Sequence, residues 1–308
     1  MTAFINYLIL PGLVFSFLAG GMGWWLERKL TARFQYRVGP PWYQSFIDVA
    51  KLFFKETIIP HGASKTLFII SPLISFSAVS LFSLMVVENY FFNKNSVGDI
   101  LVILYLLVIP SLFIILGAFS SRNPLALVGA ARETKIMLAY EFVFIISIVI
   151  VIIKSGGGLT LSDIAQTQQA QSIHIKSWSG LIGFILAIFY LQAKLCIVPF
   201  DAAEAEQEII AGTMIEYSGP LLAFYKLSKL LLYFSLPLFI ISLFAHIAAP
   251  NPFYKYLWLL VEYIIIILLV SVIKNVNPRL RIKDILAFFW FLLFPLGIIG
   301  IILAIKGS

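Results

Sequence analysis

The chain has 308 residues, 61% of them hydrophobic and only 12% charged, with a formal net charge of +7. Soluble domains are typically about 45–50% apolar and about 25% charged, so this composition excludes a soluble globular protein. A single cysteine, Cys196, excludes a disulfide, a four-cysteine zinc site and an iron–sulfur cluster held by this chain alone. We therefore predict one transmembrane domain, residues 1–308, that binds no metal and no cofactor of its own.

Apolar runs long enough to cross the hydrocarbon core of a bilayer, which is about 30 Å thick, repeat along the whole sequence. Breaks rich in charge, Gly or Pro separate them. They predict an all-α membrane protein with about eight transmembrane helices, at residues 3–26, 67–88, 100–120, 136–153, 179–198, 219–247, 255–274 and 284–305. The first run lacks the basic start of a signal peptide, so we expect a retained helix.

Most lysines and arginines fall in the segments that alternate spans place on one side of the membrane. Cytoplasmic loops carry such an excess of positive charge. We therefore predict a plasma-membrane protein with these segments in the cytoplasm and both termini outside. The topology explains the basic excess without a nucleic-acid partner.

The first predicted cytoplasmic segment, residues 25–57, is rich in charged side chains. Its later part shows Phe46, Val49 and Phe53 at helical spacing with charged residues between them. This pattern predicts an amphipathic helix at about residues 42–57, lying in the cytoplasmic membrane interface. An ordinary surface helix is the alternative.

Glu141 lies inside the fourth predicted span, where an ionised carboxylate is costly unless it is paired, protonated or in a water-filled path. Glu133 precedes it by about two helical turns and lies on roughly the same side. These positions predict a proton relay. The alternative is a structural ion pair between Glu141 and Lys226 or Lys229 of the sixth span. The other intramembrane lysine, Lys194, is expected to pair with a carboxylate or to extend to the cytoplasmic surface.

The outer loop at residues 155–177 is rich in Gly, Ser and Gln and predicts a solvated connection without chemistry. The next cytoplasmic loop, residues 199–218, is acidic. Asp201 is placed to cap a helix that has Glu204 at its third position and ends at Gly212. That helix would put Asp201, Glu204 and Glu208 on one face, where their mutual repulsion predicts raised pKa values or arginine partners. A solvated acidic face is the alternative.

These carboxylates together predict a path from the cytoplasmic surface into the membrane. The path would pass from the acidic loop through Glu216 and Glu133 to Glu141. The residues that we assign to it are Glu141, Glu133, Glu216, Glu204, Glu206, Glu208 and Asp201.

The polar motifs, in this order and at these places in the topology, resemble the membrane-anchor subunit family of complex I and its hydrogenase relatives. The resemblance covers essentially the full chain. It rests on Glu27-Arg-Lys, Arg37-Val-Gly-Pro40, Gln44 with Asp48, Lys51 and Lys55-Glu56, Arg132-Glu133, Tyr140-Glu141, Pro199-Phe-Asp201, Glu204-Ala-Glu206 and Glu216-Tyr-Ser-Gly219. Only three residues, Pro41-Trp-Tyr43, separate Pro40 from Gln44. Complex I anchors have a longer insert there, so the short version is similar to the energy-converting nickel–iron hydrogenase branch or its sulfane-sulfur-reductase relative.

The resemblance implies an anchor subunit of a ferredoxin-driven complex that exports protons or sodium ions. The implied partners are a nickel–iron hydrogenase-like large subunit, an iron–sulfur small subunit and antiporter-like membrane subunits, which carry all the redox centres. The residues implied to dock or couple the redox arm are Glu27, Arg28, Lys29, Arg33, Arg37, Asp48, Lys51, Glu56, Arg132 and Tyr217.

Three other interpretations remain at this point. The chain would be a quinone-binding subunit of an NADH:quinone or related oxidoreductase if its helices lined a quinone chamber, although the shortened segment before Gln44 disfavours a wide entrance. It would be a passive scaffold if the carboxylates only held partners. A stand-alone secondary transporter would show paired broken helices in two related halves, and the sequence contains no such repeat.

Overall fold

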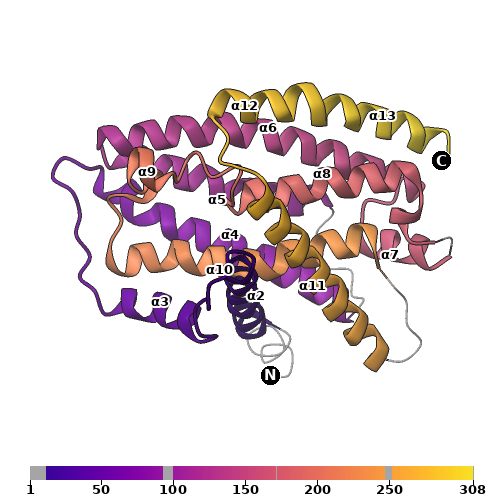
Figure 1. Ribbon diagram of the computed structural model, residues 1–308, viewed down its shortest axis with the longest axis horizontal. Helices are drawn as coiled ribbons and strands as arrows, with labels where there is room; N and C mark the ends of the chain where they lie inside the picture. Colours follow the sequence, from indigo (N-terminus) through magenta and orange to yellow (C-terminus); the bar gives the residue numbers. More distant parts are fainter. Residues whose placement is uncertain (1–11, 93–99, 171, 247–251, 308) are drawn as a thin grey trace.

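A computed structural model describes residues 12–92, 100–170, 172–246 and 252–307, apart from the side chains of three residues within helices, Glu206, Gln207 and Pro252. These residues form helices and connecting turns, with no strand among them (Figure 1). The helices are α2 (Leu13–Phe34), α3 (Gln44–Phe53), α4 (Lys65–Phe92), α5 (Ile100–Ser120), α6 (Pro124–Lys154), α7 (Leu161–Ala170), η1 (His174–Lys176), α8 (Trp178–Lys194), α9 (Glu206–Ile209), η2 (Gly212–Met214), α10 (Gly219–Phe244), α11 (Pro252–Val276), α12 (Ile282–Ala287), the π-helical turn η3 (Phe288–Leu293) and α13 (Phe294–Ile305).

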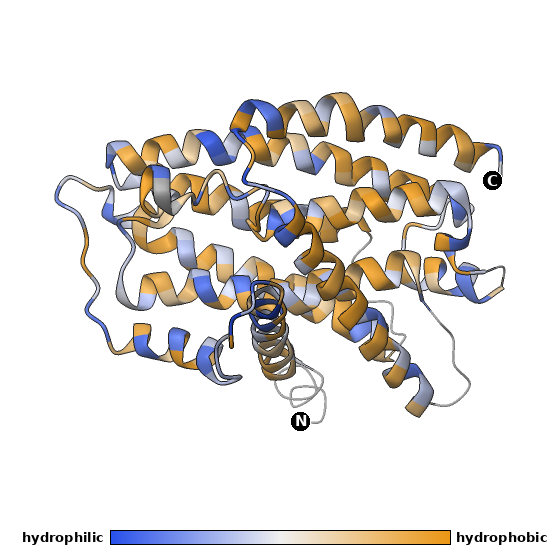
Figure 2. Cartoon of the chain, in the orientation of Figure 1, coloured by the Kyte–Doolittle hydropathy of each residue, from blue (hydrophilic) through white to orange (hydrophobic). Residues whose placement is uncertain are grey.

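The predicted fold class, an all-α membrane protein, is confirmed. Within the described ranges, six segments are long and apolar enough to cross a membrane: α4, α5, α6, α10, Phe253–Val276 in α11, and Ile282–Ile305 in α12 to α13. Helix α8, predicted at residues 179–198, is a shorter apolar helix. The first predicted span, residues 3–26, begins outside the described residues, and its described part, α2, continues to Phe34. Hydrophobic residues cover these helices along most of their length (Figure 2).

Helix α10 forms the centre of the bundle. In an apolar 18-residue stretch of α10, 89% is buried inside the protein, compared with 28% in the corresponding stretch of α11 and 28% in that of the Ile282–Ile305 span. Figure 1 shows α10 among the other helices, whereas α12 and α13 run along the outer edge beside α6. Helix α2 crosses α10 at Gly20, where an added Cβ would lie 1.9 Å from the carbonyl oxygen of Leu230. Glycine at this crossing permits the close backbone approach that is typical of packed membrane helices.

The outer loop at residues 155–177 contains helix α7, so the prediction of a solvated connection is wrong. Gln168 on α7 is only 4% exposed. Its Nε2 donates hydrogen bonds to the carbonyl oxygens of Ser242 (3.1 Å) and Leu243 (2.9 Å), and its Oε1 accepts one from the backbone N–H of His246 (2.8 Å). The last carbonyls of a helix lack partners within the helix. Gln168 therefore provides hydrogen-bond partners for the last carbonyl groups of α10 and fixes the loop on the bundle.

Replacing Gln168 by leucine should destabilise the outer end of the bundle. Leucine has a similar size but leaves two carbonyl groups and one N–H buried without a partner, so the free energy of unfolding should fall by about 1–3 kcal/mol. Thermal unfolding of the purified protein in detergent measures this loss. Gln169→Leu is the matched control, because Gln169 is an exposed neighbour on the same helix and its replacement should leave the melting temperature unchanged. Equal effects of the two variants would contradict this account.

The predicted amphipathic helix is present as α3, which is shorter than the predicted range of about residues 42–57. Val49 and Leu52 are buried, while Lys51 and Phe53 are exposed. Phe46 packs against Phe17 of α2 with ring centroids 5.5 Å apart. Figure 1 shows α3 at the end of the bundle near the first residues of α10. We refer to this end, which the charge pattern predicts to face the cytoplasm, as the loop end.

The acidic loop contains only one short α-helix, α9, so the predicted helix from Asp201 to Gly212 is wrong. Residues 201–205 form turns, and the N–H of Glu204 donates to the carbonyl oxygen of Asp201 at 3.2 Å. Gly212 begins the turn η2 with φ +53°, where a Cβ would lie 2.0 Å from the carbonyl oxygen of Ala203.

Candidate functional site

Glu141 forms a buried ion pair with Lys194. Its Oε1 lies 2.7 Å from the Lys194 Nζ, and the exposed fractions of the two side chains are 9% and 1%. The ion pair therefore exists, but its partner is on α8 and is neither Lys226 nor Lys229. Lys194 is enclosed and does not extend to the surface. Desolvation of two charges makes such a pair costly unless further hydrogen bonds support it.

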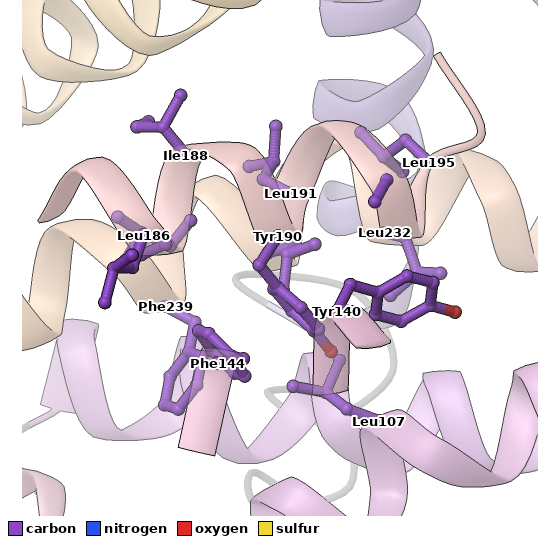
Figure 3. Close-up of a cluster of buried hydrophobic side chains, with 14 of the residues drawn as sticks. Leu107, Tyr140, Phe144, Leu186, Ile188, Tyr190, Leu191, Leu195, Leu232 and Phe239 are labelled. Carbon is purple, nitrogen blue, oxygen red and sulfur yellow. The ribbon is translucent and has the colours of Figure 1, made fainter. Parts of the chain in front are cut away.

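Two tyrosines hold the Lys194 side chain in place. Tyr140 on α6 and Tyr190 on α8 lie in contact, with ring centroids 5.6 Å apart (Figure 3). The Lys194 Nζ lies 5.5 Å from the centroid of the Tyr140 ring and 5.9 Å from that of Tyr190. Tyr190 also stacks on Phe144, with centroids 3.7 Å apart, and its hydroxyl lies 3.5 Å from the Glu141 Oε1. The negative faces of aromatic rings attract an ammonium group, so the two rings hold the Lys194 side chain between them.

A line of hydrogen bonds joins Glu141 to Glu133. Lys194 Nζ donates to the Ser111 Oγ at 3.0 Å, Ser111 and the Tyr140 hydroxyl are 3.1 Å apart, and the Tyr140 hydroxyl donates to the Glu133 Oε1 at 3.3 Å. Because Tyr140 uses its proton for Glu133, Ser111 donates to Tyr140. Lys194 donates both to Glu141 and to Ser111, and from Lys194 onward each donor faces Glu133, so the two carboxylates are linked through three side chains.

The second oxygen of Glu141, Oε2, is buried and has no hydrogen-bond partner among the described residues. Buried carboxylate oxygens normally have at least one partner. Glu141 therefore has one buried acceptor that the described side chains leave open.

A small polar cavity extends the line toward the acidic loop. Its volume is about 40 Å³, and Ser111, Glu133, Lys194, Glu204 and Lys229 are among the residues that line it. A water molecule needs roughly 10–15 Å³ of such space and two or more polar partners, both of which this cavity offers. Glu133 and Glu204 thus open onto one shared cavity that has room for water.

Glu204 is fixed at this cavity by Lys229 of α10, whose Nζ donates to its Oε2 at 3.1 Å. Burial acts to raise the pKa of Glu204, but Lys229 and Lys226 outweigh it and hold that pKa below its usual value of 4.5. Glu204 is therefore ionised at neutral pH. Loss of this charge requires acid conditions or a change in the position of the lysines.

The carboxylates of the acidic loop contact three different segments, namely α6, α10 and the connection from α11 to α12, so the prediction that Asp201, Glu204 and Glu208 share one face is wrong. Asp201 accepts from Arg279 at 2.8 Å, and Glu208 pairs with Arg132 of α6. Burial raises the pKa of Asp201 more than Arg279 lowers it. The arginine partners expected for this loop are present. The side chain of Glu206 lies outside the described part of the chain.

Glu216 and Tyr217 lie at the other side of this loop. The Asn123 side chain, which also caps α6, donates to the Glu216 Oε1. Tyr217 stacks on Phe68 with centroids 4.1 Å apart and donates to the carbonyl oxygen of Phe68 at 3.2 Å. Glu216 contacts the start of α6 and does not line the cavity between Glu133 and Glu204. Tyr217 is buried, so it positions the loop and is not part of an exposed docking surface.

The residues of the first loop segment divide into buried and exposed groups. Glu27 is 1% exposed and ties α2 to α11 through Lys274 at 2.8 Å. Asp48 accepts from Lys51 at 2.8 Å and from Arg28 at 3.4 Å. Burial acts to raise the pKa of Asp48, but its hydrogen bonds and nearby cations lower it further. Lys29 is half-buried, whereas Arg33, Arg37 and Glu56 are exposed.

Large apolar side chains are exposed beside these charges. Tyr36, Val38 and Phe54 are 100%, 76% and 91% exposed, and Trp42 and Ile58 also lie at this surface. They lie outside the six apolar spans, at the loop end of the bundle. Exposed apolar groups of this extent mark interaction surfaces. The sequence prediction named the charged residues here and missed these five, because apolar side chains give no distinct signal in so hydrophobic a chain.

The side chains that link or enclose these carboxylates, Ser111, Tyr140, Tyr190 and Lys194, were also not predicted as site residues. Serine and tyrosine occur at many places in the apolar spans, so neither stands out. Lys194 does carry a signal, because an intramembrane lysine requires a partner. Among the described residues, no group of three or more His, Cys, Asp or Glu side chains could hold a metal ion.

Comparison with known proteins agrees with this architecture. Residues 6–305 match the protein family described as NADH dehydrogenase. The chain belongs to this family. An NADH-quinone oxidoreductase subunit from a Geobacillus species is 32% identical over 292 residues, covering 89% of this chain and 85% of the relative. The corresponding protein from Thermomicrobium roseum is 33% identical over 301 residues, covering 90% and 88%.

A solved structure also matches over almost the full chain. It is the membrane-bound sulfane sulfur reductase, an archaeal respiratory membrane complex. One of its chains superposes with a TM-score of 0.90 at 28% identity, covering 99% of this chain and 100% of that chain. The predicted resemblance to complex I anchor subunits is therefore confirmed, and the chain is a multi-pass membrane-anchor subunit of a complex I-like complex.

Proposed function

We propose that this anchor subunit couples electron transfer in a peripheral redox arm to ion transport in neighbouring membrane subunits. The observation that carries the proposal is the line from Glu204 through the polar cavity to Glu133, Tyr140, Ser111, Lys194 and Glu141. It leads from the loop end of the molecule into the apolar bundle. Intramembrane ionisable groups with this arrangement are typical of proton relays.

In this proposal the trigger is a change of charge or position at the acidic loop. Glu204, Asp201 and Glu208 each hold a cation from a different segment of the chain. A new charge in a docked partner would shift these ion pairs and thereby the proton affinity of Glu133, which shares the cavity with Glu204. The relay would pass that change to Glu141.

The proposed partners are a nickel–iron hydrogenase-like large subunit and an iron–sulfur small subunit, which supply the redox centres, and antiporter-like membrane subunits. The loop end suits a protein partner because it combines exposed aromatic groups with charged side chains (Tyr36, Phe54, Arg33, Arg37 and Glu56). Aromatic and arginine side chains are enriched in protein interfaces. The pumped ion would be a proton or a sodium ion.

The branch that we propose is the ferredoxin-driven membrane-bound hydrogenase or sulfane sulfur reductase. Two observations support it. The segment between Pro40 and Gln44 is short. The chain also covers the whole matching subunit of the sulfane sulfur reductase, but 85% and 88% of the two NADH-quinone relatives. The sequence identities of 32% and 33% with NADH-quinone oxidoreductase subunits favour quinone reduction as the second candidate.

Purification of the complex that contains this chain separates the two candidates. Hydrogen evolution or sulfane sulfur reduction with reduced ferredoxin is the expected activity. Inhibitor-sensitive quinone reduction without either activity would reject the proposed branch. Solute transport in vesicles that contain this chain alone would reject the coupling function and favour a stand-alone transporter.

A further inference from the structure

A basic pocket distinct from the cavity between Glu133 and Glu204 lies at the loop end of the bundle. Its volume is about 380 Å³. The acidic loop forms one wall, and the connection from α11 to α12 forms the other. Its lining residues are Arg132, Asp201, Ala202, Ala205, Glu208, Arg279, Leu280, Arg281, Ile282 and Lys283.

The pocket lining carries more positive than negative side chains. Arg279 and Arg132 are each paired with a carboxylate, Asp201 and Glu208 respectively. Arg281 and Lys283 are exposed, and neither forms an ion pair with any described residue. The carboxylate of Asp284, on the same turn, is exposed and does not line the pocket. The pocket therefore has two cations available for an anion.

The pocket continues directly into a lipid-facing helix. Ile282 begins the apolar segment that runs to Ile305, and only 28% of an apolar 18-residue stretch within it is buried. Figure 2 shows hydrophilic residues at the start of α12 and hydrophobic residues along α13. Phe291 is 83% exposed and Leu292 is 56% exposed on this segment. An anion in the pocket would thus lie at the membrane surface with an apolar helix beneath it.

We propose that this pocket binds the headgroup of an anionic phospholipid, with its acyl chains lying along the exposed face of the Ile282–Ile305 segment. The phosphate would contact Arg281 and Lys283. Basic pockets between helices at the cytoplasmic surface bind anionic headgroups in this way, with a contribution of about 1 kcal/mol for each Lys or Arg. A free phosphate would use only the cations, whereas a phospholipid also covers the apolar face.

Binding of added lipid to the full chain in detergent, followed by native mass spectrometry, tests this proposal. The probes are phosphatidylglycerol and phosphatidylcholine. Wild-type protein should prefer phosphatidylglycerol, and the double variant Arg281→Gln/Lys283→Gln should bind it about 30-fold more weakly, which corresponds to two contacts of about 1 kcal/mol each. Both residues are exposed, so the variant should keep the wild-type melting temperature.

The matched control is Lys176→Gln/Lys306→Gln, which removes two exposed cations at the other end of the spans and should leave binding unchanged. Equal binding of the two lipids, or equal affinity of the Arg281/Lys283 variant and wild type, would overturn the proposal. Displacement of the lipid by inorganic phosphate at similar concentration would assign the pocket to a free anion. Loss of the peripheral arm from the variant complex, with lipid binding unchanged, would assign it to an acidic protein partner.

Discussion

Replacing Glu141 by glutamine is expected to slow ion transport at least tenfold, since positioned proton-transfer groups typically contribute a factor of about 10²–10⁴ to a rate, and so to lower the number of ions transported per electron. Glutamine keeps the shape of the side chain and still accepts a hydrogen bond from Lys194, but it cannot take up a proton. Redox turnover by the partner subunits should continue in detergent, where no ion gradient opposes it. The measurement is ion uptake and redox turnover of the variant complex in the same sealed vesicles.

The control for this experiment is Glu56→Gln, which changes an exposed carboxylate outside the relay. It should leave the ratio of transported ions to electrons at the wild-type value. If Glu141→Gln also leaves that ratio unchanged, the carboxylates act only as a scaffold. The proposed coupling function would then be wrong, although the family membership of the chain would stand.

Replacing Lys194 by methionine is expected to produce the largest loss of stability in the chain. The change leaves Glu141 as a buried carboxylate without a countercharge, and the loss of one partner of a buried ion pair typically costs about 3–5 kcal/mol. Ser111 and Tyr140 also lose their link to Glu141. Thermal unfolding of the purified protein in detergent should show this loss. Lys306→Met, at an exposed position near the C-terminal end, should change stability by less than about 0.5 kcal/mol.

The double variant Lys194→Met/Glu141→Gln tests the origin of the effect. It removes both charges, so it should recover most of the stability that Lys194→Met loses. Additive losses from the two substitutions would show that the residues do not interact as the 2.7 Å distance indicates. The double variant should still fail to couple ion transport, because no titratable group remains at that position.

The sequence identified Glu141 because a carboxylate inside an apolar span stands out against its surroundings, and it identified Glu133 because this residue precedes Glu141 by about two helical turns on the same side. It could not identify how they are joined. Their linkage uses Ser111, Tyr140 and Lys194 from three different helices. Lys194 is separated from Glu141 by 53 positions in the chain. Only helix packing determines which of several lysines meets the carboxylate.

The same limit explains the two wrong predictions about loops. Gln168 appeared in a polar segment, and polar composition is typical of solvated connections, yet its amide satisfies the end of α10. Asp201 and Glu204 have the spacing of a capped helix, but they form ion pairs with Arg279 and Lys229, which lie on different segments of the chain. Local patterns describe what a segment can form alone, and neighbouring helices provide stronger partners.

The sequence by itself determined that the protein lies in a lipid membrane, where its long apolar segments are and which family it resembles. Lipid requires long apolar helices, and this requirement is visible in the order of residues. The tertiary structure alone decided the partners of the charged groups, the open acceptor of Glu141 and the basic pocket at Arg281 and Lys283. These features depend on distances between helices, and the energy of a buried charge depends on the atoms that packing brings within a few ångströms.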